Sequence, residues 1–129
     1  MREPSDARKR TLALQERALR FSAAVNTACP KRFHDIPSGT VWGQLVRAAD
    51  SVSNNLLEAD DASSRADFVH KMRLTLRETK ESKQCLAKLR LSNLDGSARV
   101  GGLEQEADEL AAIFATIVLK AARGGGRAS

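Results

Sequence analysis

The sequence contains no tyrosine, and aromatic residues make up only 4% of it. Many proteins that hold single-stranded nucleic acids stack the bases on aromatic side chains, so the composition disfavours an RNA-binding sheet of that kind. Prolines are also few, with three in the chain, whereas alanine and leucine dominate the 42% of hydrophobic residues. This mixture favours helices over strands. We therefore expect an all-α protein with an aliphatic core.

Cysteines and long apolar runs are scarce as well. Cys29 and Cys85 are the only two cysteines, they lie far apart, and no signal-peptide pattern precedes them. We expect reduced thiols and a cytoplasmic location. No apolar run reaches the roughly 20 residues that a membrane-spanning helix needs, and the best stretch, residues 110–119, follows an acidic cluster. The sequence predicts a protein that does not contact a membrane.

The common catalytic and cofactor motifs are missing too. The sequence has no GxxxxGK(S/T), GxGxxG, HExxH or CxxCH pattern, which removes the signatures of nucleotide, zinc-protease and c-type haem sites. A di-iron bundle needs Glu-x-x-His pairs, but His34 lies in a predicted loop and His70 has no glutamate three residues before it. We interpret His70 as a surface residue rather than a catalytic base, and Cys85 as a core residue rather than a nucleophile. The predictions are no catalytic residue, no metal, no cofactor and no enzymatic activity.

Four stretches of the chain have the 3.6-residue period of amphipathic helices. With 129 residues the chain is expected to form one domain over residues 5–123, an antiparallel up-down-up-down four-helix bundle. Residues 1–4 and the glycine-rich residues 124–129 are expected to be disordered. The predicted helices cover about residues 5–28, 38–59, 63–92 and 102–122, and the first three begin at Ser5 or Asp6, at Ser38, and at Ser63 or Ser64.

The second predicted helix carries two apolar lines instead of one. Its main stripe includes Leu45 and Val52, and a second line of Val46, Ala49 and Leu57 runs beside it. Such a width suggests burial on two sides. Because one bundle core cannot easily use both lines, we expect the protein to bind copies of itself.

Positive charge is concentrated in the third predicted helix. That helix has eight lysines and arginines against three acidic residues, an excess equal to the net charge of +5 of the whole chain. Arg73, Arg77 and Lys80 fall on one face, and Arg47 of the preceding helix is a further contributor. We predict that this face binds the phosphates of RNA or DNA weakly and without base specificity. A basic face that is only solvated is the alternative.

Polar residues beside apolar faces are candidates for structural contacts. Asn55 and Glu58 lie near the end of the second helix, where asparagine is a poor helix former unless its amide has a partner. We expect them to bond a neighbouring helix or subunit, with simple solvation as the alternative. Glu78 and Glu81 lie at the edge of an apolar face, where an exposed pair such as Arg77 with Glu81 competes with an ion pair at an interface.

Two blocks of sequence carry a resemblance. Residues 44–59, QLVRAADSVSNNLLEA, and residues 68–89, FVHKMRLTLRETKESKQCLAKL, resemble the four-helix bundle family also called ribosomal protein S23-like or 23S rRNA intervening-sequence proteins. The resemblance covers about residues 10–122 and departs at Ala59, where the family has glycine, and at Cys85, where an aromatic residue is common. The matching residues are Gln44, Arg47, Ala48, Ser51, Asn55 and Glu58 in the first block and Lys71, Leu76, Glu78, Glu81 and Leu86 in the second.

The resemblance implies a left-handed antiparallel bundle that commonly assembles into a pentameric ring and has no established enzymatic activity. Relatives encoded within ribosomal RNA insertions are suspected RNA binders, and the similar accessory variability proteins of diversity-generating retroelements engage nucleic acid and a reverse transcriptase. We therefore expect a non-enzymatic homo-oligomeric scaffold, with a pentamer favoured, that binds RNA or DNA. The alternative is a protein-binding adaptor whose partner, for example a reverse transcriptase, is encoded nearby.

Overall fold

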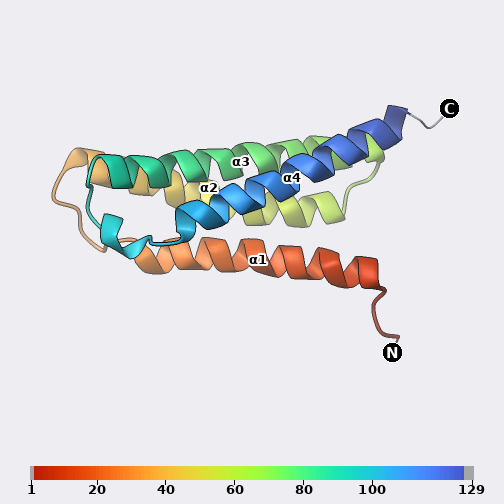
Figure 1. Cartoon of the computed structure of the whole chain (residues 1–129), viewed down its shortest axis with the longest axis horizontal. Coiled ribbons are helices and arrows are strands. Elements are labelled where there is room, and N and C mark those ends of the chain that lie inside the picture. Colours follow the sequence, from red (N-terminus) through yellow and green to blue (C-terminus); the bar gives the residue numbers. More distant parts are fainter. Residues whose placement is uncertain (1, 127–129) are drawn as a thin grey trace.

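A computed structural model of the protein describes residues 2–126. The chain forms α1 (Asp6–Ala28), α2 (Ile36–Asp60), α3 (Arg65–Leu91) and α4 (Leu103–Gly126), with a short 3-10 helix, η1 (Ser97–Arg99), before α4. The helices lie alongside one another in an elongated bundle, and the chain reverses its direction at each connection (Figure 1). The described residues contain no strand, and none of the described helices combines the length and apolar character needed to cross a membrane. The prediction of an all-α fold with four helices is confirmed.

Side-chain caps decide where the first three helices begin. Ser5 caps α1 and Ser64 caps α3, each by accepting a hydrogen bond from the backbone N–H three residues further on. The predicted cap of α2 is wrong, because Asp35 caps this helix and accepts a hydrogen bond of 2.8 Å from the backbone N–H of Ser38. Pro37 fits the first turn of α2, where no intrahelical N–H is required.

The end of α4 also differs from the prediction. The helix continues to Gly126, so the prediction of disorder is wrong for residues 124–126. Glycine lowers helix stability, but the Arg65 guanidinium donates a hydrogen bond of 3.2 Å to the carbonyl oxygen of Ala121 and lies close to Gly124. This contact with α3 supports the last turns. Met1 and residues 127–129 of the segments predicted to be disordered lie outside the described residues.

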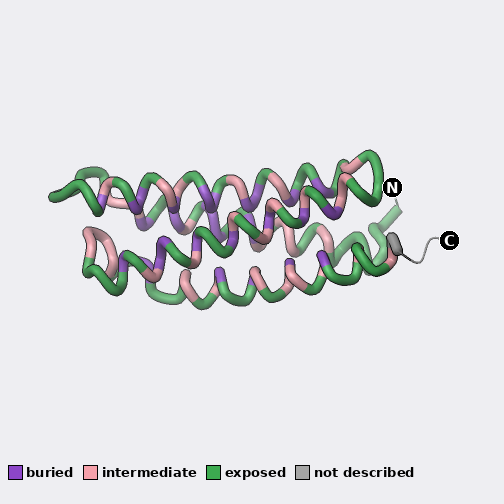
Figure 2. Tube along the Cα trace, turned by 90° about the horizontal axis from the view of Figure 1, so that it is seen from above, coloured by how far each residue is buried: buried purple, intermediate pink, exposed green. Residues whose placement is uncertain are grey.

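The core runs along the inner side of all four helices (Figure 2). Within the second apolar line of α2, Ala49 is fully buried and Val46 is half-buried, whereas Leu57 is 50% exposed. A single bundle therefore uses most of this line. The largest fully buried hydrophobic side chains are Trp42, Phe21, Phe114, Leu45, Met72, Leu86, Leu89 and Leu110.

α3 contributes hydroxyl groups to the interior. Thr75, Thr79 and Ser82 have no exposed surface, and each hydroxyl donates a hydrogen bond of 2.7–2.9 Å to the carbonyl oxygen four residues earlier. These bonds satisfy the polar groups within the helix itself. The line of small residues that made α3 look less hydrophobic in the sequence is therefore part of the core.

The connection between α3 and α4 is tied to the start of α2. The indole Nε1 of Trp42 donates a hydrogen bond of 2.6 Å to the carbonyl oxygen of Asp95, and the Ser38 hydroxyl oxygen accepts one of 3.0 Å from the Asp95 N–H. Gly96 follows with a φ of 77° and lies against Pro30 and Trp42. These contacts close one end of the bundle.

Candidate nucleic-acid interface

The three basic residues predicted to form a face on α3 all lie on the outside of the bundle. Arg73, Arg77 and Lys80 are exposed, and their spacing turns them away from the buried Thr75 and Thr79. An oxygen of the neighbouring Glu78 lies 3.7 Å from the Arg77 guanidinium. Within the described part of the chain, Arg73 and Lys80 form no ion pair.

Arg47 does not join this group. It is exposed on α2, on the side where Cys85 of α3 lies. Burial raises the pKa of the Cys85 thiol and so does the charge of Glu81, while the charges of Lys88 and Arg47 lower it. Cys85 projects about 120° to 140° away from Arg73 and Lys80 around the helix axis, and about 80° away from Arg77. The four predicted nucleic-acid contacts therefore form two groups on different sides of α3.

The two sequence blocks that carry the family resemblance meet at the outer seam between α2 and α3. The Glu58 carboxylate on α2 lies 3.7 Å from the Lys71 ammonium group on α3. Asn55 is half-buried one helical turn before Glu58. Glu58 itself is exposed, so this pair is expected to contribute less than about 1 kcal/mol to the stability of one bundle.

Glu78 lies two helical turns after Lys71 on the same face of α3. Burial raises the pKa of its carboxyl group, the neighbouring Glu81 raises it further, and Arg77 lowers it. The Glu78 side chain is 18% exposed, whereas Glu81 is an exposed residue. Arg77 therefore approaches Glu78, and the exposed pair of Arg77 with Glu81 considered from the sequence is not formed.

Replacement of Glu78 by glutamine is expected to raise the melting temperature near neutral pH. The folded-state pKa of Glu78 is raised above its ordinary value of 4.5, so ionisation of this group destabilises the fold, and the cost disappears as the pH falls through the folded pKa. Because glutamine resembles protonated glutamate, the advantage of Glu78→Gln should vanish in acid. Thermal unfolding followed by circular dichroism across this pH range measures the difference.

The control for this experiment is Glu3→Gln, whose carboxyl group is 86% exposed. This replacement should change the melting temperature little at any pH. A Glu78→Gln protein that is less stable than the wild type near neutral pH would contradict the prediction, because it would show that the ionised carboxylate is held by favourable contacts.

Two carboxylates near the start of α4 pair with cations of α3. The Arg90 guanidinium donates two hydrogen bonds to the Glu104 carboxylate, at 2.9 and 3.1 Å, and the Lys83 ammonium group donates one of 2.6 Å to Asp108. No acidic residue follows Glu109 in α4. Two cations in the second half of α3, Lys83 and Arg90, are therefore paired with α4, whereas the first half of α3 faces no carboxylate of α4.

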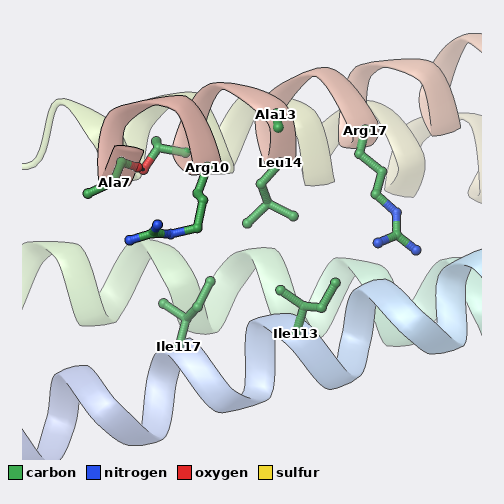
Figure 3. Close-up of a pocket in the computed structure, with 8 residues that line it drawn as sticks. Ala7, Arg10, Ala13, Leu14, Arg17, Ile113 and Ile117 are labelled. Carbon is green, nitrogen blue, oxygen red and sulfur yellow. The ribbon is translucent and has the colours of Figure 1, made fainter. Parts of the chain in front are cut away.

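An open apolar groove of about 600 Å³ lies between α1 and α4. Figure 3 shows Leu14 of α1 pointing toward Ile113 and Ile117 of α4, with Arg10 and Arg17 on either side. Sequence analysis did not single out these residues as a site, because their meeting depends on how far apart the two helices lie.

Arg17 anchors one end of this groove. Its guanidinium donates hydrogen bonds of 2.8 and 2.7 Å to the Glu106 carboxylate and one of 3.2 Å to Glu109. The hydrogen bonds from Arg17 lower the pKa of Glu106 below its usual range. This network joins α1 to the start of α4, and the groove opens toward the beginning of α1.

No metal site accompanies these surfaces. Across residues 2–126, histidine, cysteine, aspartate and glutamate side chains do not gather in any group of three that could hold a metal ion.

Comparison with known proteins agrees with the fold and with the two sequence blocks. A solved structure, a protein of unknown function from the S23 ribosomal protein family of Bacteroides thetaiotaomicron VPI-5482, is 23% identical, with a TM-score of 0.67 over 81% of this chain and 97% of that chain. At this identity the likeness concerns the fold. No protein with a curated description matches the chain. The model of the 23S rRNA-intervening sequence protein family matches residues 10–116. Since that match spans most of the sequence, the chain belongs to the 23S rRNA-intervening sequence protein family.

Proposed function

We propose that the protein is a non-enzymatic, homo-oligomeric scaffold in the cytoplasm that binds RNA or DNA weakly and without base specificity. The observation that carries this proposal is the uneven neutralisation of α3. Arg90 and Lys83 are paired with carboxylates of α4, whereas Arg73 and Lys80 lack such partners among the described residues. Phosphates bound to these cations would release condensed counterions, which is the main source of non-specific affinity for nucleic acids.

The family description also supports a phosphate-rich partner, since it refers to 23S rRNA. We place Arg73, Arg77 and Lys80 at the main contact surface. Arg47, on the other side of α3, would contact only a nucleic acid that wraps around the helix. The contacts are to phosphates, so they position the nucleic acid and read no base sequence.

Self-association completes the proposal. The up-down-up-down bundle is proposed to assemble into a ring, with five copies favoured from the family resemblance. Leu12, Leu19 and Leu57 are 41%, 54% and 50% exposed, and the groove between α1 and α4 is a separate apolar surface. Another copy can cover either of them. A ring would repeat the basic face of α3, and the fields of the subunits would add.

Salt dependence is the test of this function. The protein is expected to bind RNA or duplex DNA at micromolar concentration and about 50 mM salt, and the affinity should fall steeply as salt rises. Replacing Arg73, Arg77 and Lys80 together by glutamine should weaken binding and flatten the salt dependence, because fewer phosphates are contacted. Fluorescence anisotropy measures the affinity. Sedimentation should give a multiple of 14.0 kDa.

A matched control separates the proposed face from net charge alone. Lys31, Arg32 and Arg99 are exposed in the connections at one end of the bundle, away from the middle of α3, and their joint replacement by glutamine removes the same charge. This control should retain most of the affinity. No binding by the wild type would overturn the nucleic-acid role and leave the protein-binding adaptor, with a partner such as a reverse transcriptase, as the better interpretation. A clean monomer in sedimentation would overturn the assembly.

A further inference from the structure

One line of residues on α4 faces α3 along the whole bundle. Glu104 and Asp108 occupy its first two positions and pair with cations of α3. Continuing with the spacing of a helix, this line passes Ala111, Ala115 and Ala122. Beyond Asp108, this line therefore carries the methyl groups of alanines, and the ion pairs with α3 do not continue along it.

An open hollow of about 570 Å³ lies at the end of this line, between the start of α3 and the last turns of α4. Short apolar side chains line part of it, and the other lining groups are two guanidinium groups and an imidazole. The hydrogen bond from Arg65 to the carbonyl oxygen of Ala121, at 3.2 Å, holds one guanidinium at the rim. The apolar lining is Ala66, Val69, Ala121 and Ala122, and the other lining residues are Arg65, His70 and Arg73.

We propose that this hollow binds a nucleoside monophosphate, with the phosphate on Arg65 and Arg73 and the nucleoside against Val69 and the alanines. A guanidinium presents planar, paired N–H donors that match phosphate oxygens. A phosphate monoester carries a charge of about −1.5 to −2 near neutral pH, more than an internal phosphodiester of a strand, so two cations favour it. The hollow has no acidic lining residue that would repel this charge.

This inference rests on the proposed function and adds to it a defined contact between a phosphate monoester and the hollow. The same chemistry has two sources, a free nucleotide and the 5′-phosphorylated end of a strand. His70 lines the hollow together with the two arginines, and its ring offers a further hydrogen bond to the phosphate or the sugar.

The test begins with small probes and isothermal titration calorimetry. Adenosine monophosphate is expected to bind, and both adenosine and inorganic phosphate are expected to bind more weakly. Arg65→Gln should weaken the affinity for adenosine monophosphate about tenfold, because a charge-assisted hydrogen bond is lost. Ala122→Glu should weaken it at least as much, because the new carboxylate can pair with the arginines and extend the line of Glu104 and Asp108.

Two controls accompany these variants. Arg99→Gln removes an exposed arginine at the other end of the bundle, and Ala112→Glu adds a carboxylate at an exposed position of α4. Both should bind adenosine monophosphate as the wild type does. Circular dichroism checks that all four variants are helical, and Ala122→Glu should be at least as stable as the wild type because it adds an ion pair.

Oligonucleotides distinguish the two sources. Tighter binding of a 5′-phosphorylated strand than of the same strand with a 5′-hydroxyl group supports the strand end as the ligand, and equal binding supports the free nucleotide.

The proposal is overturned if adenosine monophosphate does not bind at millimolar concentration, if inorganic phosphate binds equally well, or if Arg65→Gln has no effect on the affinity. Long RNA that still binds in a salt-dependent manner would leave the proposed function intact in each of these cases. Conversely, binding of adenosine monophosphate without any binding of long RNA would overturn the proposed nucleic-acid role and support the nucleotide site in the hollow.

Discussion

Replacing Trp42 by alanine is expected to lower the free energy of unfolding by about 3–5 kcal/mol. Trp42 is the largest fully buried side chain, so its truncation leaves a cavity that the surrounding helices fill only in part. The same change removes the hydrogen bond from the indole Nε1 to the carbonyl oxygen of Asp95, which ties the connection before α4 to α2. Chemical denaturation monitored by circular dichroism gives the free energy of unfolding.

Trp42→Phe is the matched variant because it retains most of the apolar volume and removes the indole N–H. It should cost about 1–3 kcal/mol, clearly less than Trp42→Ala. Equal losses in the two variants would show that the hydrogen bond and not the packing dominates. A loss below about 1 kcal/mol in Trp42→Ala would contradict the placement of this side chain in the core.

Gly96→Ala is expected to lower the free energy of unfolding by about 2–4 kcal/mol, which combines the cost of a left-handed backbone with that of overpacking. Gly96 has a φ of 77°, and a Cβ atom at this position would lie 2.8 Å from Cγ of Pro30 and 3.0 Å from Cζ2 of Trp42. Neither ring can move without disturbing the closed end of the bundle. The same denaturation experiment measures the change.

Gly43→Ala provides the control, with the opposite expected sign. Gly43 lies inside α2, and an added Cβ atom would meet nothing within 4 Å. Alanine there should raise the stability by about 0.5–1 kcal/mol, because it is the better helix former. If Gly96→Ala and Gly43→Ala shift the stability in the same direction, the close contact of Gly96 with Pro30 and Trp42 is not present in solution.

The charge on α3 illustrates how a surface property arises from the pairing of helices. The sequence shows all basic residues of this helix, and their excess of positive charge suggested a basic face. In the bundle, Lys83 and Arg90 form ion pairs with α4, and Arg47 lies on a different side of α3 from Arg73. Arg73 and Lys80, toward the middle of α3, keep their charge for a phosphate-bearing partner.

The sequence by itself determined the number of helices, most of their ends and the aliphatic character of the core. These features are local, because helical periodicity and the chemistry of a cap such as Ser5 or Ser64 depend on residues within one or two turns. The start of α2 was misplaced because both Asp35 and Ser38 are good caps by their chemistry, and the choice between them involves the tertiary structure. Asp35 caps the helix, and the Ser38 hydroxyl accepts a hydrogen bond from the distant Asp95 N–H.

Tertiary structure alone decided which charges are paired, which carboxyl group is buried and where the surface is hollow. Arg17 forms hydrogen bonds with Glu106, although the two residues are 89 positions apart in the sequence. The pKa of the Glu78 carboxyl group is raised because helix packing buries it. The hollow at Arg65 exists because Ala122, and not an acidic residue, meets the start of α3. The physical reason is that helical periodicity shows which face of a helix is apolar, whereas the rotation and spacing of two packed helices decide which polar residues at the edges of that face meet.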